Sequence, residues 1–148
     1  MPRFLLDTSC MVAVICSWHE HHERAVQEVE RRLDEGGVLV IAAPALVETY
    51  AVLTRLPPPH RLSPADSRTL LDVNFLRDAT ETVALDVAAY RFLLQRAPER
   101  SIAGGHIYDA VIVACAQAAR VETVLTFNER QFVPLAADDL HIVVPQEQ

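Results

Sequence analysis

The sequence predicts an α/β protein, a three-layer α/β/α sandwich around a mostly parallel sheet of about five strands. Short apolar runs of β type alternate along the chain with longer segments of helical periodicity, which is the pattern of βαβ units. The apolar runs are continuous, so helices should cover both faces of the sheet. The 148 residues contain no internal repeat and no low-complexity linker, and we expect a single domain over residues 1–148.

Five short runs are predicted as buried strands because each is apolar and is bounded by a charge, a glycine or a helix-start signal. The first run ends at Asp7, and the second follows the pair Gly36-Gly37. In chain order the predicted strands are Phe4–Leu6, Val38–Ala42, Thr82–Leu85, Thr123–Phe127 and His141–Val144.

The helical segments have recognisable starts and stops. Gly36-Gly37 ends the first helix, Pro44 suits the first position of the second, and the prolines at 57–59 end it. Ser63 and Asp86 are predicted as the N-caps of the third and fourth helices. The fifth is nearly all apolar and should be buried on most sides. In chain order the predicted helices are His19–Glu35, Ala45–Leu56, 64 to about 77, 87 to about 97, and His106–Arg120.

The charge composition excludes several chemistries. All 13 basic residues are arginine, and the chain contains no lysine. This excludes a Schiff-base lysine, a Walker-type phosphate loop and kinase-type phosphoryl transfer. The net charge of −7 argues against a broad basic surface for nucleic acid, although a bound metal ion can reverse the field locally.

The cysteines and the N-terminus bear on the compartment. Cys10, Cys16 and Cys115 form no C-x-x-C pair, and their odd number fits a reducing compartment better than an oxidising one. No signal-peptide core precedes Asp7, and no apolar stretch is long enough to span a bilayer. We therefore expect a soluble cytoplasmic protein without membrane contact.

Several polar residues fall where parallel strands end, which is the edge at which open α/β sheets bind ligands. Asp7 follows the first strand directly, and Asn128 and Glu129 follow the fourth. Glu48 lies early in the helix after the second strand, and Asp109 in the first turn of His106–Arg120. Clustered carboxylates require a cation, and oxygen ligands suit Mg²⁺ or Mn²⁺ better than zinc. Metal-dependent phosphodiester hydrolysis is the reaction class that follows.

Each of these acids has a simpler structural explanation to set beside the functional one. Glu48 and Asp109, taken singly, are explained as acids that interact favourably with a helix N-terminus. Asp7 is different, because an unpaired charge beside an apolar run is costly to bury. Asp86 follows a strand as well, but its role as an N-cap suffices, so it is left out of the site.

Histidines and aromatic residues also invite functional interpretations. The cluster His19-x-His21-His22 lacks the spacing of a zinc site and is predicted as exposed histidines at a helix start. His106 lies one turn before Asp109, where contact with a substrate phosphate and a purely structural role are both open. The aromatic residues are predicted as core or interface residues, with base stacking as the alternative for an exposed ring. These aromatics are Trp18, Tyr50 and Tyr108.

Four segments together resemble the PIN-domain nucleases. They are Phe-Leu-Leu-Asp7-Thr8-Ser9, Pro-Ala-Leu-Val-Glu48-Thr-Tyr, Ile-Tyr-Asp109-Ala-Val-Ile-Val-Ala, and Val-Leu-Thr126-Phe-Asn128-Glu-Arg-Gln-Phe. Each motif is loose, but their order and spacing cover essentially the whole chain. The short length is similar to that of VapC-type toxins of type II (VapBC) toxin–antitoxin systems.

This resemblance implies a Mg²⁺- or Mn²⁺-dependent endoribonuclease that is inhibited by a VapB-like antitoxin. It implies that Asp7, Glu48 and Asp109 bind the metal directly or through water, with the hydroxyls of Ser9 and Thr126 at the edge of the site. The spacing of His106 from Asp109 is the reason to expect His106 at that edge as well. The family often has a fourth acid where this chain has Asn128, which is expected to contribute more weakly or through another ligand. RNA as substrate, a homodimer and a toxin–antitoxin hetero-oligomer are implied as well.

Three other functions stay open. A phosphatase on a related α/β scaffold is one, although the haloacid-dehalogenase pattern requires an acid where Ser9 stands and a lysine that this chain lacks. A phospho-acceptor receiver is disfavoured because it also requires a lysine. The third is a catalytically weakened PIN-like module that binds RNA or a partner, an alternative suggested by Asn128.

Overall fold

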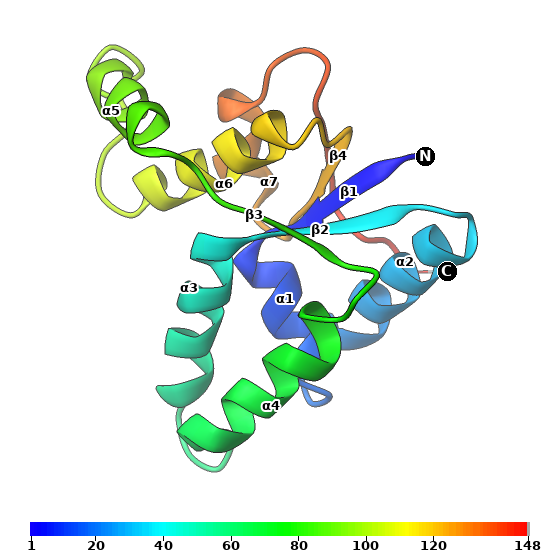
Figure 1. Cartoon of the computed structure of the whole chain (residues 1–148). Helices are drawn as coiled ribbons and strands as arrows, with labels where there is room; N and C mark the ends of the chain where they lie inside the picture. Colours follow the sequence, from blue (N-terminus) through cyan, green and yellow to red (C-terminus); the bar gives the residue numbers. More distant parts are fainter. Residues whose placement is uncertain (148) are drawn as a thin grey trace.

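A five-stranded parallel sheet forms the centre of the protein in the computed structural model, which describes residues 1–147 (Figure 1). The domain predicted over 1–148 extends one residue beyond this range. The strand order is β3-β2-β1-β4-β5, and all four neighbouring pairs are parallel. The strands are β1 (Arg3–Leu6), β2 (Val38–Ala42), β3 (Glu81–Val83), β4 (Thr123–Leu125) and β5 (His141–Val143).

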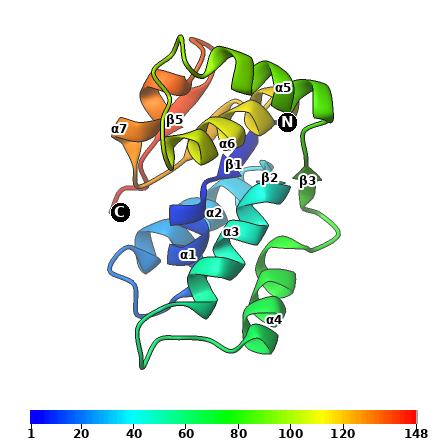
Figure 2. The same ribbon diagram turned by 90° about the vertical axis from the view of Figure 1, so that its left-hand side faces the viewer.

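Helices cover both faces of this sheet, so the predicted three-layer sandwich is confirmed (Figures 1 and 2). Right-handed crossovers in one direction, from β1 to β2 and on to β3, place α1–α4 on one face. The crossovers in the other direction place α5–α7 on the opposite face. The helices are α1 (Thr8–Ile15), α2 (His22–Asp34), α3 (Ala43–Thr54), α4 (Pro64–Phe75), α5 (Val87–Arg96), α6 (His106–Ala118) and α7 (Glu129–Phe132).

Two helices and a 3₁₀ turn are not predicted from the sequence, and one predicted helix starts too early. Helix α1 is apolar on nearly all sides and follows β1 without a loop, so it shows no amphipathic period. Helix α7 has only four residues, and the 3₁₀ turn Val133–Leu135 has three. The helix predicted from His19 begins at His22, and residues 16–21 form a loop.

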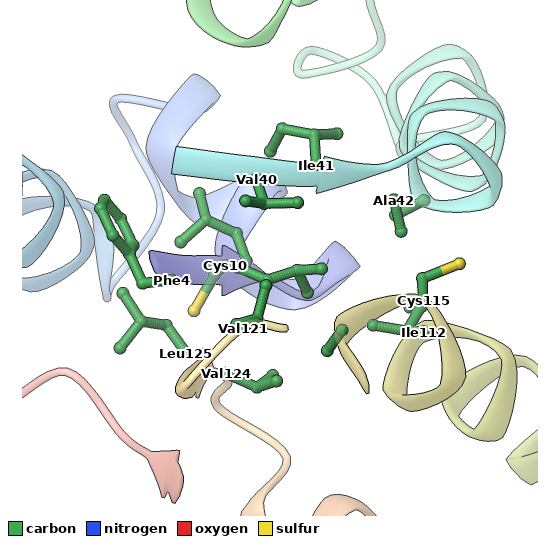
Figure 3. Packing of buried hydrophobic residues seen from close by; sticks show 14 of the residues in the cluster. Phe4, Cys10, Val40, Ile41, Ala42, Ile112, Cys115, Val121, Val124 and Leu125 are labelled. Atoms are coloured by element: carbon green, nitrogen blue, oxygen red, sulfur yellow. The ribbon is translucent and has the colours of Figure 1, made fainter. Parts of the chain in front are cut away.

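The core consists of the inner strands and the helices that pack on both of their faces (Figure 3). Leu5, Leu6, Ile41 and Leu125 are fully buried. Burial of each such side chain stabilises the fold by about 1.5–3 kcal/mol. All three cysteines are buried and free. No helix within residues 1–147 has the length and apolar character needed to cross a bilayer.

The register of the sheet determines where the polar rim lies. Leu6 of β1 is paired with Leu125 of β4, so the residues that follow these strands are neighbours at the same edge. After β1 the chain adds β2 and β3 on one side of that strand, and it then crosses over to add β4 and β5 on the other side. This reversal of strand order is the point at which open parallel sheets bind ligands.

Candidate active site

Asp7 stands at the end of β1, where it continues the pairing with β4. Its backbone N–H donates to the carbonyl oxygen of Leu125 at 3.1 Å. The same residue is the N-cap of α1, because one of its carboxylate oxygens, Oδ1, accepts from the backbone N–H of Cys10 at 2.9 Å. Asp7 thus joins the sheet edge to the start of a helix, a role that sequence reasoning missed because it missed α1.

Two hydroxyl groups hold the same carboxylate. Ser9 Oγ donates to Asp7 Oδ1 at 2.7 Å, and Thr126 Oγ1 donates to Oδ2 at 2.6 Å. Each hydroxyl also accepts a bond from the chain beyond β4. Ser9 Oγ accepts from the backbone N–H of Phe127 at 3.1 Å, and Thr126 Oγ1 from that of Asn128 at 2.8 Å. The ends of β1 and β4 are therefore tied together through the Asp7 carboxylate.

The environment of Asp7 strongly disfavours its charge. Only 2% of the residue is exposed, and this burial raises the pKa of Asp7 from its ordinary 3.8 to about 6. Hydrogen bonds from Thr126, Ser9 and Cys10 lower that pKa in part, whereas the negative charge of Asp109 raises it further. An uncharged Asn or Ser would cap α1 without this cost. The burial of an acid beyond what capping requires is typical of a functional site.

Glu48 and Asp109 bring two more carboxylates to this edge, from α3 and α6. Both are half-buried, and both line the same open pocket as Asp7. Burial raises the pKa of Asp109, Glu48 raises it further, and His106 acts in the opposite direction. Among residues 1–147, no side chain donates a hydrogen bond to the carboxylate of Glu48 or Asp109. The three predicted acids thus share one pocket, and two of them have no donor in the described part of the chain.

The remaining predicted residues lie around this pocket in different ways. Ser9 and Asn128 line it, while Thr126 lies buried behind Asp7. His106 is close enough to affect the pKa of Asp109, but its Nε2 lies 2.8 Å from the carbonyl oxygen of Gln131 and connects α6 to α7. Glu129 is exposed at the start of α7 and does not line the pocket.

Two histidines reach the pocket although they are predicted to be exposed at a helix start. His19 and His21 are half-buried and line it from the loop between α1 and α2. Burial lowers the pKa of His19, and the neighbouring His21 contributes in the same direction. No local signal indicates this placement, because it depends on how the loop returns over the end of the sheet.

The donor set of the pocket fits a hard divalent cation. Its ionisable side chains are carboxylates and two histidines, and no arginine lines the pocket within residues 1–147. No three His, Cys, Asp or Glu side chains in that range are grouped tightly enough to hold a metal by themselves. Water molecules would therefore have to complete the coordination of a cation here, as they do for Mg²⁺ in many protein sites. A closed zinc site does not fit, since it requires four protein ligands in contact with the ion.

The protein is an open α/β protein with a parallel sheet, and its carboxylate pocket lies where the strand order reverses. Comparison with known families identifies the family to which this kind of protein belongs. The model of the PIN domain matches residues 4–136. The chain belongs to the PIN domain family.

Within that family the chain is similar to VapC proteins. Ribonuclease VapC40 of Mycobacterium tuberculosis is 44% identical over 115 residues, which are 76% of this chain and 78% of the relative. The solved structure of VapC20 from M. tuberculosis, described as a sarcin-ricin loop cleaving toxin, superposes with a TM-score of 0.67 at 14% sequence identity. The alignment covers 86% of this chain and 92% of the VapC20 chain. The structure of VapBC2 from Rickettsia felis, bound to a promoter DNA fragment, also has a TM-score of 0.67, at 16% sequence identity. That alignment covers 96% of this chain and 98% of the matched chain. The resemblance to PIN-domain and VapC-type proteins is thus confirmed.

Proposed function

We propose that this chain is an endoribonuclease toxin that hydrolyses RNA phosphodiester bonds with Mg²⁺ or Mn²⁺ bound at Asp7, Glu48 and Asp109, directly or through water molecules. The single observation that carries this proposal is the convergence of three carboxylates from β1, α3 and α6 on one open pocket. Acids gathered in this way repel one another unless a cation joins them. The identity to Ribonuclease VapC40 supports RNA as the substrate.

The chain's own residues have distinct tasks in this reaction. Ser9 and Thr126 hold the Asp7 carboxylate in one orientation through hydrogen bonds to its two oxygens. Glu48 and Asp109 offer oxygens free of protein donors in the described structure, and Asn128 offers an amide at the pocket edge. A bound divalent cation would supply positive charge at the phosphate and lower the pKa of an attacking water. The partly buried pocket strengthens each of these electrostatic interactions.

Cleavage of RNA by the purified chain tests this function. We expect cleavage only with Mg²⁺ or Mn²⁺, and a loss on the order of 100-fold or more for Asp109→Asn, because the change removes charge that holds the cation. Asp138→Asn, which alters an exposed acid of a loop, is the matched control and should cleave like the wild type.

Calorimetric titration with Mn²⁺ provides a readout that does not depend on cleavage. The wild type should bind Mn²⁺, and Asp109→Asn should bind it more weakly. Equal cleavage by the wild type and Asp109→Asn would indicate a contaminating nuclease and contradict the proposal. Absence of Mn²⁺ binding by the wild type would instead favour the alternative of a catalytically weakened binding module.

The proposal includes a VapB-like antitoxin and a homodimer as protein partners in the cytoplasm. The VapBC2 structure supports the antitoxin, and three buried cysteines without a disulfide agree with a reducing compartment. Beside Glu48, an apolar depression between α3 and α6 offers surface for a partner, with Val47 72% and Tyr108 63% exposed.

Light scattering on the purified chain tests the homodimer. We expect twice the mass of the chain, 2 × 16.5 kDa, because burying Val47 and Tyr108 removes apolar area from water. Tyr108→Arg should shift the mass toward the monomer, whereas Arg68→Ala on the exposed side of α4 should leave it unchanged. A monomeric wild type at high concentration would contradict a homodimer.

A further inference from the structure

The rings of the loop between α1 and α2 pack on one another and connect distant parts of the chain. Trp18 stacks on His60 with 4.1 Å between ring centroids. The ring of His19 lies 5.9 Å from that of Trp18 and 5.5 Å from that of His21. His21 in turn stacks on Phe127 at 4.5 Å, with the ring planes 20° apart. The rings therefore connect the segment between α3 and α4 to the residues that follow β4.

Phe127, at the inner end of these rings, is held by three kinds of contact. Its partly buried ring packs against the hydrophobic core and stacks on His21. The guanidinium of Arg24, on α2, lies 5.4 Å from the centroid of the same ring and also contacts His21. Within residues 1–147, Arg24 forms no ion pair with a carboxylate, so Phe127 and His21 are its partners. We call Phe127, His21 and Arg24 the Phe127 brace.

The backbone of Phe127 is bonded to the network around Asp7. Its N–H donates to Ser9 Oγ at 3.1 Å, and Ser9 Oγ donates to Asp7 Oδ1 at 2.7 Å. Because a hydroxyl has one proton, the bond that Ser9 accepts from Phe127 turns that proton toward the carboxylate. Thr126, the preceding residue, donates to the other carboxylate oxygen. Both hydroxyl bonds to Asp7 thus depend on where residues 126 and 127 lie.

Few backbone bonds fix this stretch of chain. It follows the end of β4, and the N–H of Thr126 makes its last bond to β5, to the carbonyl oxygen of Val143 at 3.0 Å. The N–H of Phe127 has the Ser9 hydroxyl as its acceptor and makes no bond to a carbonyl oxygen in the described part of the chain. The side chain of Phe127 is therefore the main contact that holds this residue from outside the carboxylate network.

We propose that Arg24 and His21 are positioning residues of the proposed ribonuclease, because they hold the Phe127 ring and thereby fix the hydrogen bonds that orient the Asp7 carboxylate. This inference rests on the proposed function and adds residues to the same reaction. Arg24 does not line the carboxylate pocket, so it acts through Phe127. A cation beside an aromatic ring stabilises the position of that ring. Small misplacements of a group at the reacting centre lower the rate steeply, so loss of the brace is expected to lower kcat.

Amide hydrogen exchange, followed by NMR in EDTA, tests the brace without metal or RNA. In Arg24→Gln we expect the Phe127 amide to exchange on the order of fivefold faster, because the ring contact that keeps its hydrogen bond closed is weakened. The amide of Val124, which is buried in β4, should exchange as in the wild type. The matched control is Arg96→Gln, which removes a guanidinium 5.5 Å from the ring centroid of Phe92, away from the pocket, and should leave the Phe127 amide unchanged.

A second pair of variants tests the ring while the charge of Arg24 is kept. Phe127→Leu should lower the protection of the amide at position 127, because leucine has no flat face for His21 and the guanidinium. Phe127→Tyr keeps the ring and should restore the protection that Phe127→Leu loses. Thermal melting verifies that each variant is folded.

Steady-state kinetics shows whether the brace acts through Ser9. Arg24→Gln should lower kcat on the order of tenfold with little change in KM, because its effect is on the carboxylate and not on the RNA. Ser9→Ala removes the hydroxyl that links Phe127 to Asp7. Added to Ser9→Ala, Arg24→Gln should therefore cause less further loss than it causes alone. Equal losses in the two backgrounds would overturn the inference.

The outcomes separate this inference from the proposed function. An unchanged Phe127 amide in Arg24→Gln, or equal acceleration of the Phe127 and Val124 amides, overturns the inference whether or not the protein cleaves RNA. A higher KM at unchanged kcat also overturns it, because Arg24 would then contact the RNA. If the Phe127 amide alone exchanges faster and the wild type does not cleave RNA, the brace holds the Asp7 network and the ribonuclease is wrong.

Discussion

Replacement of Asp7 by asparagine is expected to abolish RNA cleavage and to make the folded protein more stable at neutral pH. Activity is lost because the carboxylate proposed to bind the cation is gone. Stability rises because an uncharged amide replaces a buried carboxylate. Asparagine keeps two of the hydrogen bonds, because its Oδ1 can accept from Ser9 and Cys10. Its amide can donate to Thr126 Oγ1, but the Thr126 hydroxyl then loses the acceptor that it has in Asp7, which offsets part of the gain in stability.

The pKa of Asp7 determines the sign of this change in stability and the pH range over which it develops. In the folded protein that pKa is about 6, above the ordinary 3.8, so the fold binds the proton more tightly than the unfolded chain does. The wild type therefore loses stability as the pH rises from about 4 to about 6, and the loss is complete above that range. A difference between 3.8 and about 6 corresponds to at most about 3 kcal/mol in the free energy of unfolding.

Urea unfolding of the wild type and Asp7→Asn at several pH values, in EDTA, measures this effect. The two curves should converge near pH 4 and separate by up to about 3 kcal/mol at pH 7. Added Mg²⁺ should reduce the separation, because a cation stabilises the ionised carboxylate of the wild type. Asp138→Asn should follow the wild type throughout. The prediction is wrong if the variant is less stable than the wild type at pH 7. The contacts of the Asp7 carboxylate would then stabilise the fold by more than the burial of its charge destabilises it.

Thr126→Val is expected to destabilise the fold and to shift the acid limb of the pH–activity profile upward. The fully buried hydroxyl of Thr126 donates to Asp7 Oδ2 and accepts from the backbone N–H of Asn128. Valine has nearly the same shape but satisfies neither partner. The buried Asp7 oxygen left unpaired costs about 1–3 kcal/mol, and the N–H of Asn128, which is only partly buried, costs less. The bond from Thr126 also lowers the pKa of Asp7, so without it that pKa rises further.

A pH–rate profile separates these two consequences. Activity in Thr126→Val should require a higher pH than in the wild type, in addition to any overall loss of stability seen by thermal melting. Thr126→Ser keeps the hydroxyl and should restore the acid limb, although the missing methyl group leaves a small cavity. An acid limb that is the same in all three proteins would refute a role of Thr126 in the ionisation of Asp7.

The candidate site divides into residues that local sequence indicates and residues that it cannot. Asp7 directly follows β1 and Asp109 lies in the first turn of α6, whereas Glu48 lies one turn further into α3. The strand-end rule gathers the three acids at one edge. Helix α1 is missed, because a helix buried on nearly all sides has no polar face to mark its period. Its absence from the prediction also hides the capping role of Asp7.

The sequence by itself determined the succession of the strands and of the helices other than α1 and α7, the parallel sheet and the edge at which the acids meet. These features follow from local hydrophobic patterns and from the handedness of βαβ connections, both of which act on neighbouring segments. Only the tertiary structure decided how deeply Asp7 is buried, that Thr126 bonds to it across 119 positions of the chain, and that His19 and His21 reach the pocket. Burial and side-chain contact depend on the packing of distant segments, and no local pattern in the chain encodes that packing.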